Sequence, residues 1–113
     1  MTLEELCDDY LCFLKDKNFV IRITDWYEKE INQENKHLLI YYNDDSGALR
    51  KKFNINEVED ELIPFLIRYK ELFNGEVLFY LRLDEIKFNI NDILNGIPYY
   101  IECDAIAIKL KII

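Results

Sequence analysis

The sequence predicts an α+β domain in which two helices pack on one antiparallel sheet, in the order α-β-β-β-α-β-β-β. Apolar residues recur with helical spacing in two segments and with alternating spacing in most of the others. In addition, a chain of 113 residues that is 50% hydrophobic is long enough to bury one core. We therefore expect residues 1–113 to form a single globular domain.

The first helix is expected to begin after Thr2 and to end near Lys17-Asn18. Thr2 and Glu5 have the spacing of a capping box, in which each side chain bonds to the backbone N–H of the other residue. A single apolar stripe follows at helical spacing, formed by Leu3, Leu6, Cys7, Tyr10, Leu11 and Leu14. We expect this stripe to face the core.

Three strands are expected next, at Phe19–Thr24, His37–Asn43 and Ala48–Ile55. Polar turns are expected at Asn32–Lys36, before the second strand, and at Asp44–Gly47, after it. Residues 25–31, which follow the first strand, fit a longer strand or a short helix equally well. Because the connections are short, we expect the three strands to form an antiparallel meander.

A second helix is expected to start at Asn56, a residue type favoured at helix N-caps, and to carry an apolar stripe from Val58 to Phe73. Acidic residues in its first turns suit the positive end of the helix dipole. Pro64 lacks an N–H, so we expect it to kink or restart the helix. The pair Asn74-Gly75 is expected to end it.

The last part of the chain is expected to be mostly strand. Strands are predicted at Glu76–Leu83 and Ile86–Ile90, and Pro98–Cys103 together with Ala105–Ile112 is expected to finish the chain as strand. We expect a turn at Asp84-Glu85 and one helical turn at Asn91–Asn95. In the final strand, large apolar residues alternate with alanine and lysine, a period of two that is typical of a strand.

One pentapeptide occurs twice, as Lys52–Asn56 and as Lys87–Asn91. Each copy is expected to be a strand end that runs into a helix cap. Because the chain is rich in Ile, Asn and Lys, such matches arise easily by chance. We favour coincidence, together with the shared chemistry of a strand end and a helix cap, as the explanation of the two copies. An internal duplication stays open as the alternative.

Acidic residues outnumber basic ones by 22 to 14, which gives a net charge of −8. The excess lies in residues 1–61, which carry fifteen Asp and Glu against eight Lys and Arg, whereas residues 62–113 carry seven against six. A field of this sign repels phosphate backbones, so we expect no direct binding to nucleic acid or to anionic membranes. It attracts basic protein surfaces. The simpler interpretation, acidity for solubility alone, carries about equal weight.

The cysteines indicate an intracellular protein without a metal site. Cys7, Cys12 and Cys103 are odd in number, and the first two point about 140° apart on the expected helix. No C-x-x-C motif occurs and His37 is the only histidine, so the spacing of a zinc site is absent. We expect small buried thiols in a reducing cytoplasm. The sequence also lacks an apolar run long enough to span a bilayer and the pattern of a signal peptide.

We expect no catalytic residue, no metal and no cofactor, and hence not an enzyme. Ser46 is the only serine, and a Ser or Cys nucleophile would need His37 as its base. His37 opens a strand after a polar turn, so we expect a solvated residue at a sheet edge. Paired carboxylates are numerous, but they lie at turns or on outer helix faces. None follows the pattern of a calcium loop.

Aromatic residues beside acidic ones are the pattern most suggestive of binding. Exposed Tyr or Trp residues supply contact area, and neighbouring carboxylates engage Arg and Lys. The simpler interpretation is that most of these aromatic residues belong to the core. The predicted partner-binding residues are Asp25, Trp26, Glu28, Glu30, Tyr42, Asp44 and Asp45, with Glu57, Glu59 and Asp60 as a second acidic face.

In its general profile the chain resembles bacterial toxin-immunity proteins and phage-encoded anti-CRISPR and anti-restriction inhibitors, although no motif carries this resemblance. It implies an inhibitor that occludes a basic groove of a nuclease, a toxin or another nucleic-acid enzyme. Two alternatives stay open. The first five predicted elements also resemble class I type III secretion chaperones, which form homodimers, and a small regulatory or structural subunit is the third option. A homodimer is possible through the last strand.

Overall fold

The computed structural model describes residues 1–14, 19–24, 36–42, 52–82, 84–96 and 100–111. The helices and strands within these ranges follow the predicted order, including the short helix near residue 91. In chain order they are α1 (Leu3–Leu14), β1 (Phe19–Thr24), β2 (His37–Tyr42), β3 (Phe53–Asn54), the 3₁₀ helix η2 (Ile55–Glu57), α2 (Glu59–Arg68), the 3₁₀ helix η3 (Lys70–Leu72), β4 (Phe73–Leu81), β5 (Asp84–Asn89), α3 (Ile90–Leu94), β6 (Glu102–Cys103) and β7 (Ala105–Leu110).

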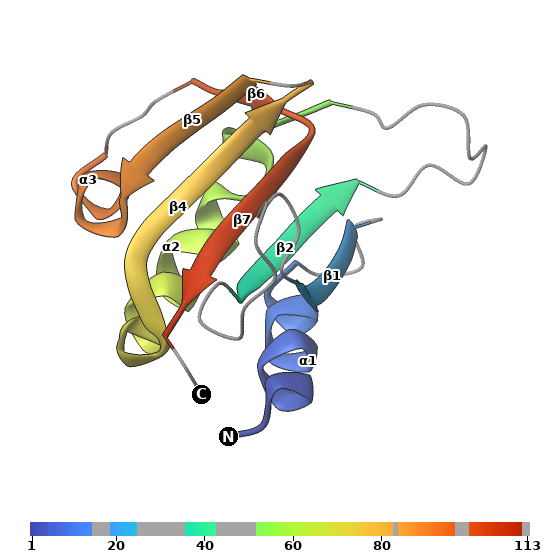
Figure 1. Cartoon of the computed structure of the whole chain (residues 1–113), viewed down its shortest axis with the longest axis vertical. Helices are drawn as coiled ribbons and strands as arrows, with labels where there is room; N and C mark the ends of the chain where they lie inside the picture. Colours follow the sequence, from blue (N-terminus) through green and yellow to red (C-terminus); the bar gives the residue numbers. More distant parts are fainter. Residues whose placement is uncertain (15–18, 25–35, 43–51, 83, 97–99, 112–113) are drawn as a thin grey trace.

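Five strands form one antiparallel sheet in the order β1-β2-β7-β4-β5, and β3 pairs with β6 in a small second sheet (Figure 1). The predicted α+β class is therefore confirmed. The predicted meander is wrong, because β2 pairs with β1 and β7, whereas Phe53 of β3 lies opposite Cys103 of β6. β7 takes the central position because both of its faces are apolar and buried. Residues 48–51 of the predicted third strand lie outside the described residues.

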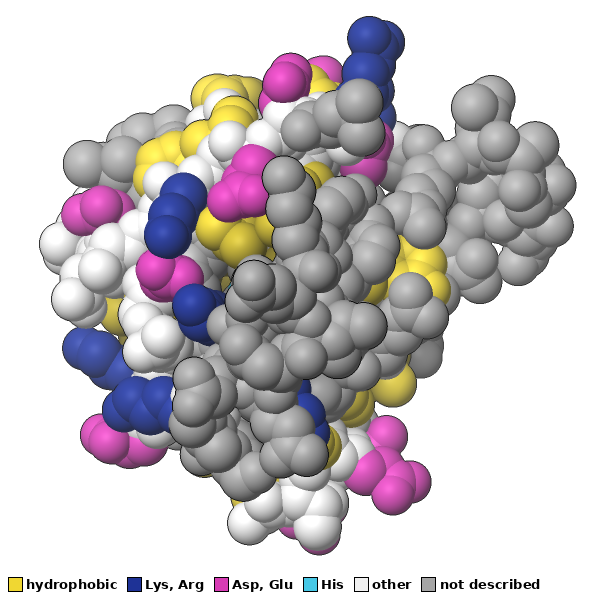
Figure 2. Space-filling model, viewed as in Figure 1, with side chains coloured by type: hydrophobic (Ala, Val, Ile, Leu, Met, Phe, Trp, Pro, Cys, Tyr) yellow, Lys and Arg dark blue, Asp and Glu magenta, His cyan; other side chains and the backbone are white. Residues whose placement is uncertain are grey.

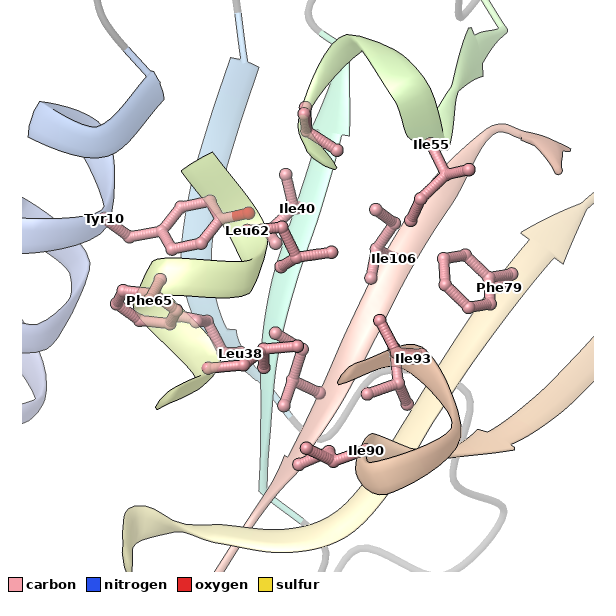
Figure 3. Packing of buried hydrophobic residues seen from close by; sticks show 14 of the residues in the cluster. Tyr10, Leu38, Ile40, Ile55, Leu62, Phe65, Phe79, Ile90, Ile93 and Ile106 are labelled. Atoms are coloured by element: carbon pink, nitrogen blue, oxygen red, sulfur yellow. The ribbon is translucent and has the colours of Figure 1, made fainter. Parts of the chain in front are cut away.

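The helices cover one face of the sheet and build the main core with it (Figure 3). Tyr10 of α1 meets Phe65 of α2 edge to face, with ring centroids 4.2 Å apart. In Figure 3, Leu62 of α2 and Ile93 of α3 point toward the strands. Burial of one such side chain contributes about 1.5–3 kcal/mol, so this cluster dominates the stability of the fold. Its largest fully buried members include Phe53, Phe79, Leu6, Leu14, Leu38, Ile40, Leu66 and Ile106.

The opposite face of the sheet carries a smaller buried cluster and a charge network. The cluster is formed by Leu39, Leu78, Tyr80, Ala105 and Ala107. In the network, the Glu76 carboxylate lies 2.8 Å from the Lys87 ammonium and 3.5 Å from the Lys109 ammonium. Figure 2 shows Lys and Arg side chains next to Asp and Glu side chains on the half of the molecule that holds β4 and β5. Acidic residues in this region are therefore largely balanced by basic ones.

The capping box of α1 is present. The Glu5 N–H donates to the Thr2 hydroxyl at 3.1 Å, and the Thr2 N–H donates to the Glu5 carboxylate at 3.4 Å. The predicted stripe is narrower than expected, since Leu11 is 43% exposed. At 100° per residue Leu11 lies at the margin of the face that its neighbours Tyr10 and Leu14 bury. Residues 15–18, where the helix was predicted to end, lie outside the described residues.

The second helix differs from its prediction at both ends. α2 begins at Glu59, and the predicted cap Asn56 lies inside η2. Pro64 sits within α2 without ending or restarting it. The helix stops at Arg68, and Phe73 already belongs to β4, so Asn74-Gly75 do not end it. Gly75 has a φ of +78° where the register of β4 against β7 shifts, a conformation that favours glycine.

The repeated pentapeptide folds in the same way twice. In both copies an extended asparagine caps a helix: the Asn54 side chain accepts from the Asn56 N–H at 3.0 Å, and the Asn89 side chain accepts from the Asn91 N–H at 2.9 Å. The isoleucine that follows each cap is buried in the main core. The expected change from strand to helix cap is therefore confirmed. In the first copy the cap is Asn54, two residues before the predicted cap Asn56.

The hairpin between β4 and β5 turns two residues earlier than predicted. Leu81 pairs with Asp84, so Asp84 and Glu85 belong to β5 and do not form the turn. Arg82 has a φ of +57°, and its N–H donates to the Asp104 carboxylate at 2.6 Å. This bond ties the hairpin to the segment between β6 and β7. No helix within the described residues has the length and apolar character needed to cross a bilayer.

Candidate functional site

The structure describes only part of the predicted binding surface. Asp25, Trp26, Glu28, Glu30, Asp44 and Asp45 lie outside the described residues. Tyr42 is described only by its backbone, which pairs with Phe19 in the sheet. The predicted second acidic face, Glu57, Glu59 and Asp60, is described in full.

These three residues sit where η2 leads into α2. Glu57 and Asp60 are exposed and Glu59 is half-buried. Together with Glu61 they place four carboxylates within five residues of chain, at the end of α2 where the helix dipole is positive. This position stabilises the negative charges and the helix at the same time. It does not by itself require a ligand.

A cavity lies between α1 and α2, and Asp60 and Glu61 from the acidic start of α2 line it. Its volume is about 410 Å³, and we call it the helix groove. Asp60 is the only predicted site residue among those that line it. The lining residues are Asp9, Cys12, Phe13, Asp60, Glu61, Pro64 and Arg68.

Ring packing and one hydrogen bond fix the two walls of the helix groove. Phe65 of α2 contacts both Tyr10 and Phe13 of α1, with centroid distances of 4.2 Å and 5.8 Å. The Tyr69 hydroxyl donates to the Asp9 carboxylate. Burial of the phenol and this hydrogen bond raise the pKa of Tyr69, so it stays a donor at neutral pH. α1 and α2 are therefore held as one rigid unit around the groove.

The residues that line the helix groove carry a net negative charge. Three lining residues are acidic and one, Arg68, is basic. Neither Asp60 nor Glu61 forms an ion pair with another residue in the described part of the chain. The Arg68 guanidinium lies over the Tyr69 ring, 5.5 Å from its centroid. This contrasts with Glu76, whose carboxylate has two lysine partners on the opposite side of the sheet.

An apolar rim borders the helix groove. Ile67 is 61% exposed and lies one turn after Pro64 on the same face of α2. Phe13 is half-buried in the opposite wall. Carboxylates complement a basic surface electrostatically, and an exposed aliphatic side chain adds apolar area that a partner can bury.

The burial of His37 and of Cys12 differs from what the sequence predicted. His37 is buried rather than solvated, because β2 pairs with β1 on one side and β7 on the other. Cys103 is buried, Cys7 is half-buried and Cys12 is exposed, so the expectation of buried thiols fails for Cys12. Burial, with the charges of Asp104 and Glu57, raises the pKa of the Cys103 thiol to about 12 and keeps it protonated.

The sequence did not indicate the other six residues that line the groove, which are Asp9, Cys12, Phe13, Glu61, Pro64 and Arg68. Asp9 and Phe13 are four residues apart, so they share one side of α1. Helical spacing could have grouped them. It could not show that this side of α1 faces α2, which depends on how the two helices pack on the sheet.

Comparisons of the chain with protein-family models, with curated proteins and with solved structures gave no match.

Proposed function

We propose that this chain is an acidic, non-catalytic binding protein that docks on a basic surface of another protein and occludes it, as an inhibitor does. The fitting partners are nucleases, toxins and other nucleic-acid enzymes, whose basic grooves bind phosphate backbones. Toxin immunity and inhibition of CRISPR or restriction nucleases are the matching roles. The proposal places the chain in the cytoplasm, where its free thiols are stable.

The observation that carries the proposal is the helix groove. It combines carboxylates that have no ion-pair partner among the described residues with an exposed aliphatic rim. Carboxylates that serve only solubility can lie anywhere on the surface, whereas these carboxylates line a cavity between two packed helices. Asp9 and Asp60 come from different helices, so the groove concentrates charge that neither helix holds alone.

The mechanism has two physical steps. The net charge of −8 steers a basic protein toward the chain and raises the association rate at low salt. Short-range contacts at the helix groove then hold the partner, so that nucleic acid can no longer reach its basic groove. Trp26, Asp44 and Asp45 are also proposed to bind the partner, and Trp26→Ala combined with reversal of both aspartates is expected to weaken binding.

The test is affinity capture from host lysate at about 50 mM and about 500 mM salt, levels that bracket the screening of surface charge. The captured protein is identified by mass and assayed for cleavage of labelled nucleic acid with and without the chain. Two variants are run in parallel. E57Q/E59Q/D60N neutralises the acidic end of α2, and D84N/E85Q/D92N removes the same charge from β5 and α3 as a matched control.

A basic enzyme that is released at high salt, inhibited by the chain and bound poorly by E57Q/E59Q/D60N supports the proposal. A self-dimer carrying an unfolded segment contradicts it and favours the chaperone alternative. Recovery of a basic enzyme that cleaves nucleic acid equally well with the chain bound also contradicts it, because occlusion is the core of the proposal.

A further inference from the structure

We propose that two copies of this chain form a weak symmetric dimer through β5, with the two β5 strands antiparallel and Ile86 on the two-fold axis. This surface is separate from the helix groove, because no residue that lines the groove belongs to β5. β5 and β1 form opposite edges of the sheet, and α1 packs beside β1 (Figure 1). The inference goes beyond the proposed function and does not depend on it.

The edge of the sheet at β5 is open to a further strand. β5 is the last strand in the order β1-β2-β7-β4-β5, and within the described residues only β4 pairs with it. Five of its six residues are exposed. The outer side of such a strand has N–H and C=O groups that can pair with another chain. β7, through which the sequence allowed a homodimer, is paired on both sides by β2 and β4, so that expectation is wrong.

The hairpin decides which backbone groups of β5 point outward. Leu81 pairs with Asp84 across two intervening residues, so the Asp84 N–H points toward the Leu81 carbonyl. The direction of the backbone groups alternates from one residue to the next along a strand. The groups of Ile86 therefore also point toward β4, whereas those of Glu85 and Lys87 point outward. In a dimer through this edge, Glu85 and Lys87 are the residues that exchange backbone hydrogen bonds.

Charge selects one register for two such strands. When Ile86 lies opposite Ile86 of the second copy, each Glu85 lies opposite a Lys87, and opposite charges across two strands are stabilising. A shift by two residues places Glu85 opposite Glu85 or Lys87 opposite Lys87, which is destabilising. A shift by one residue sets outward backbone groups against inward ones. A lysine ordinarily protects an edge strand from pairing, but in the first register it faces a carboxylate.

The side chains of β5 suit this register on both faces of the sheet. Glu85 and Lys87 lie opposite members of the smaller buried cluster, on the face away from the helices. The Lys87 ammonium already lies 2.8 Å from the Glu76 carboxylate, and an ammonium has three donors, so it can bind a second carboxylate. On the other face Ile86 lies opposite Phe79 and is 42% exposed. Two such side chains at the two-fold axis remove apolar area from water.

The contact is small, so we expect the dimer to be weak. One pair of short strands buries less than the roughly 1,000 Å² of a stable interface, and two chains of net charge −8 repel each other. We expect a dissociation constant of about 100 µM at about 150 mM salt, where the Debye length is about 8 Å. At about 1 µM, a suitable concentration for affinity capture, the chain is then monomeric. The control D84N/E85Q/D92N of the capture test is therefore unaffected by dimerisation.

Sedimentation equilibrium of the full chain from about 10 µM to about 1 mM tests the inference. E85K and K87E each place like charges opposite each other, and each is expected to weaken dimerisation about tenfold. An equimolar mixture of E85K and K87E has opposite charges at both pairs and is expected to form a heterodimer with about the affinity of the wild-type dimer. E71K and K111E make the same charge changes at exposed positions outside β5 and are the matched controls, with no more than about a twofold effect expected.

A measurement on the wild-type chain locates the contact even if K87E, which loses the Glu76 ion pair, does not fold. Amide hydrogen exchange is followed by NMR at about 50 µM and about 1 mM. The N–H groups of Glu85 and Lys87 are expected to exchange about threefold more slowly at the higher concentration, as the monomer fraction falls. The N–H of Ile86 points toward β4 in monomer and dimer alike and is the internal control.

A wild-type chain that stays monomeric at about 1 mM overturns the inference. So does a mixture of E85K and K87E that associates no better than either variant alone, or a dimer in which the Glu85 and Lys87 N–H groups gain no protection. Each of these outcomes leaves the proposed function standing, because a monomer can still occlude a basic enzyme. Conversely, a dimer through β5 that inhibits no captured enzyme supports this inference while the proposed function fails.

Discussion

At the scale of single residues, the least expected feature is a buried hydroxyl. Tyr10 is fully buried between α1 and α2, and its hydroxyl has no hydrogen-bond partner among the described residues. Burial, aided by the charge of Glu61, raises the pKa of this phenol above its ordinary value and keeps it neutral. Tyr69 is the opposite case, since its hydroxyl is bonded to Asp9.

Tyr10→Phe is therefore expected to leave the free energy of unfolding unchanged or to raise it by about 1 kcal/mol, because no hydrogen bond is lost. Tyr69→Phe is the matched change and is expected to lower it by about 1 kcal/mol. Urea unfolding followed by circular dichroism measures both. A larger loss for Tyr10→Phe than for Tyr69→Phe would contradict this assignment.

The two cap asparagines offer a second comparison between residues. Asn54→Ala and Asn89→Ala are each expected to reduce the free energy of unfolding by about 0.5–2 kcal/mol, the range for loss of an N-cap. Asn56→Ala and Asn91→Ala are the controls, because these residues supply only backbone N–H groups to the caps. Equal losses at all four positions would show that the caps are not the source of the effect.

At the scale of elements, the helices and strands could largely be predicted, whereas their ends and partners could not. The capping box of α1 and the alternation in β1 and β7 are local signals, and all three elements form where these signals predict them. The position of β7 between β2 and β4 is set by contacts between segments far apart in sequence. For the same reason the helix groove was not predicted, although Asp60 was.

Pro64 is expected to destabilise α2, because it removes one hydrogen bond from the helix. Pro64→Ala restores the N–H and the bond to the Asp60 carbonyl, so we expect the free energy of unfolding to rise by about 1–3 kcal/mol. Thermal unfolding of the two proteins measures the change. Ile67→Ala, one turn later at an exposed position, serves as the control and is expected to have little effect. A destabilised Pro64→Ala protein would contradict the account of this helix.

Glu76 joins three strands of the sheet and makes stability depend on pH. The hydrogen bond from Lys87, opposed by burial and aided by the charge of Lys109, lowers the pKa of Glu76 in the folded protein. A lowered folded pKa stabilises the fold above the unfolded pKa of about 4.3, and this stabilisation is lost as pH falls through the folded value. The difference in unfolding free energy between wild type and Glu76→Gln should therefore shrink from pH 7 to pH 3. A constant difference would refute this role.

At the scale of the whole molecule, charge is distributed unevenly in a way that composition only partly reveals. The sequence shows the acidic excess in residues 1–61. The structure adds that Glu76, in the second half, is paired with lysines, whereas Asp60 and Glu61 have no such partners among the described residues. The proposed function depends on this local imbalance rather than on the net charge.

The rate of association with the captured partner tests that claim most directly. We would measure it from about 50 mM to about 500 mM salt for wild type, E57Q/E59Q/D60N and D84N/E85Q/D92N, whose net charges differ equally from wild type. We predict that E57Q/E59Q/D60N binds more slowly and with a weaker salt dependence, and that D84N/E85Q/D92N stays close to wild type. Equal slowing by both triple variants would mean that only the total charge matters and would contradict a binding surface at the helix groove.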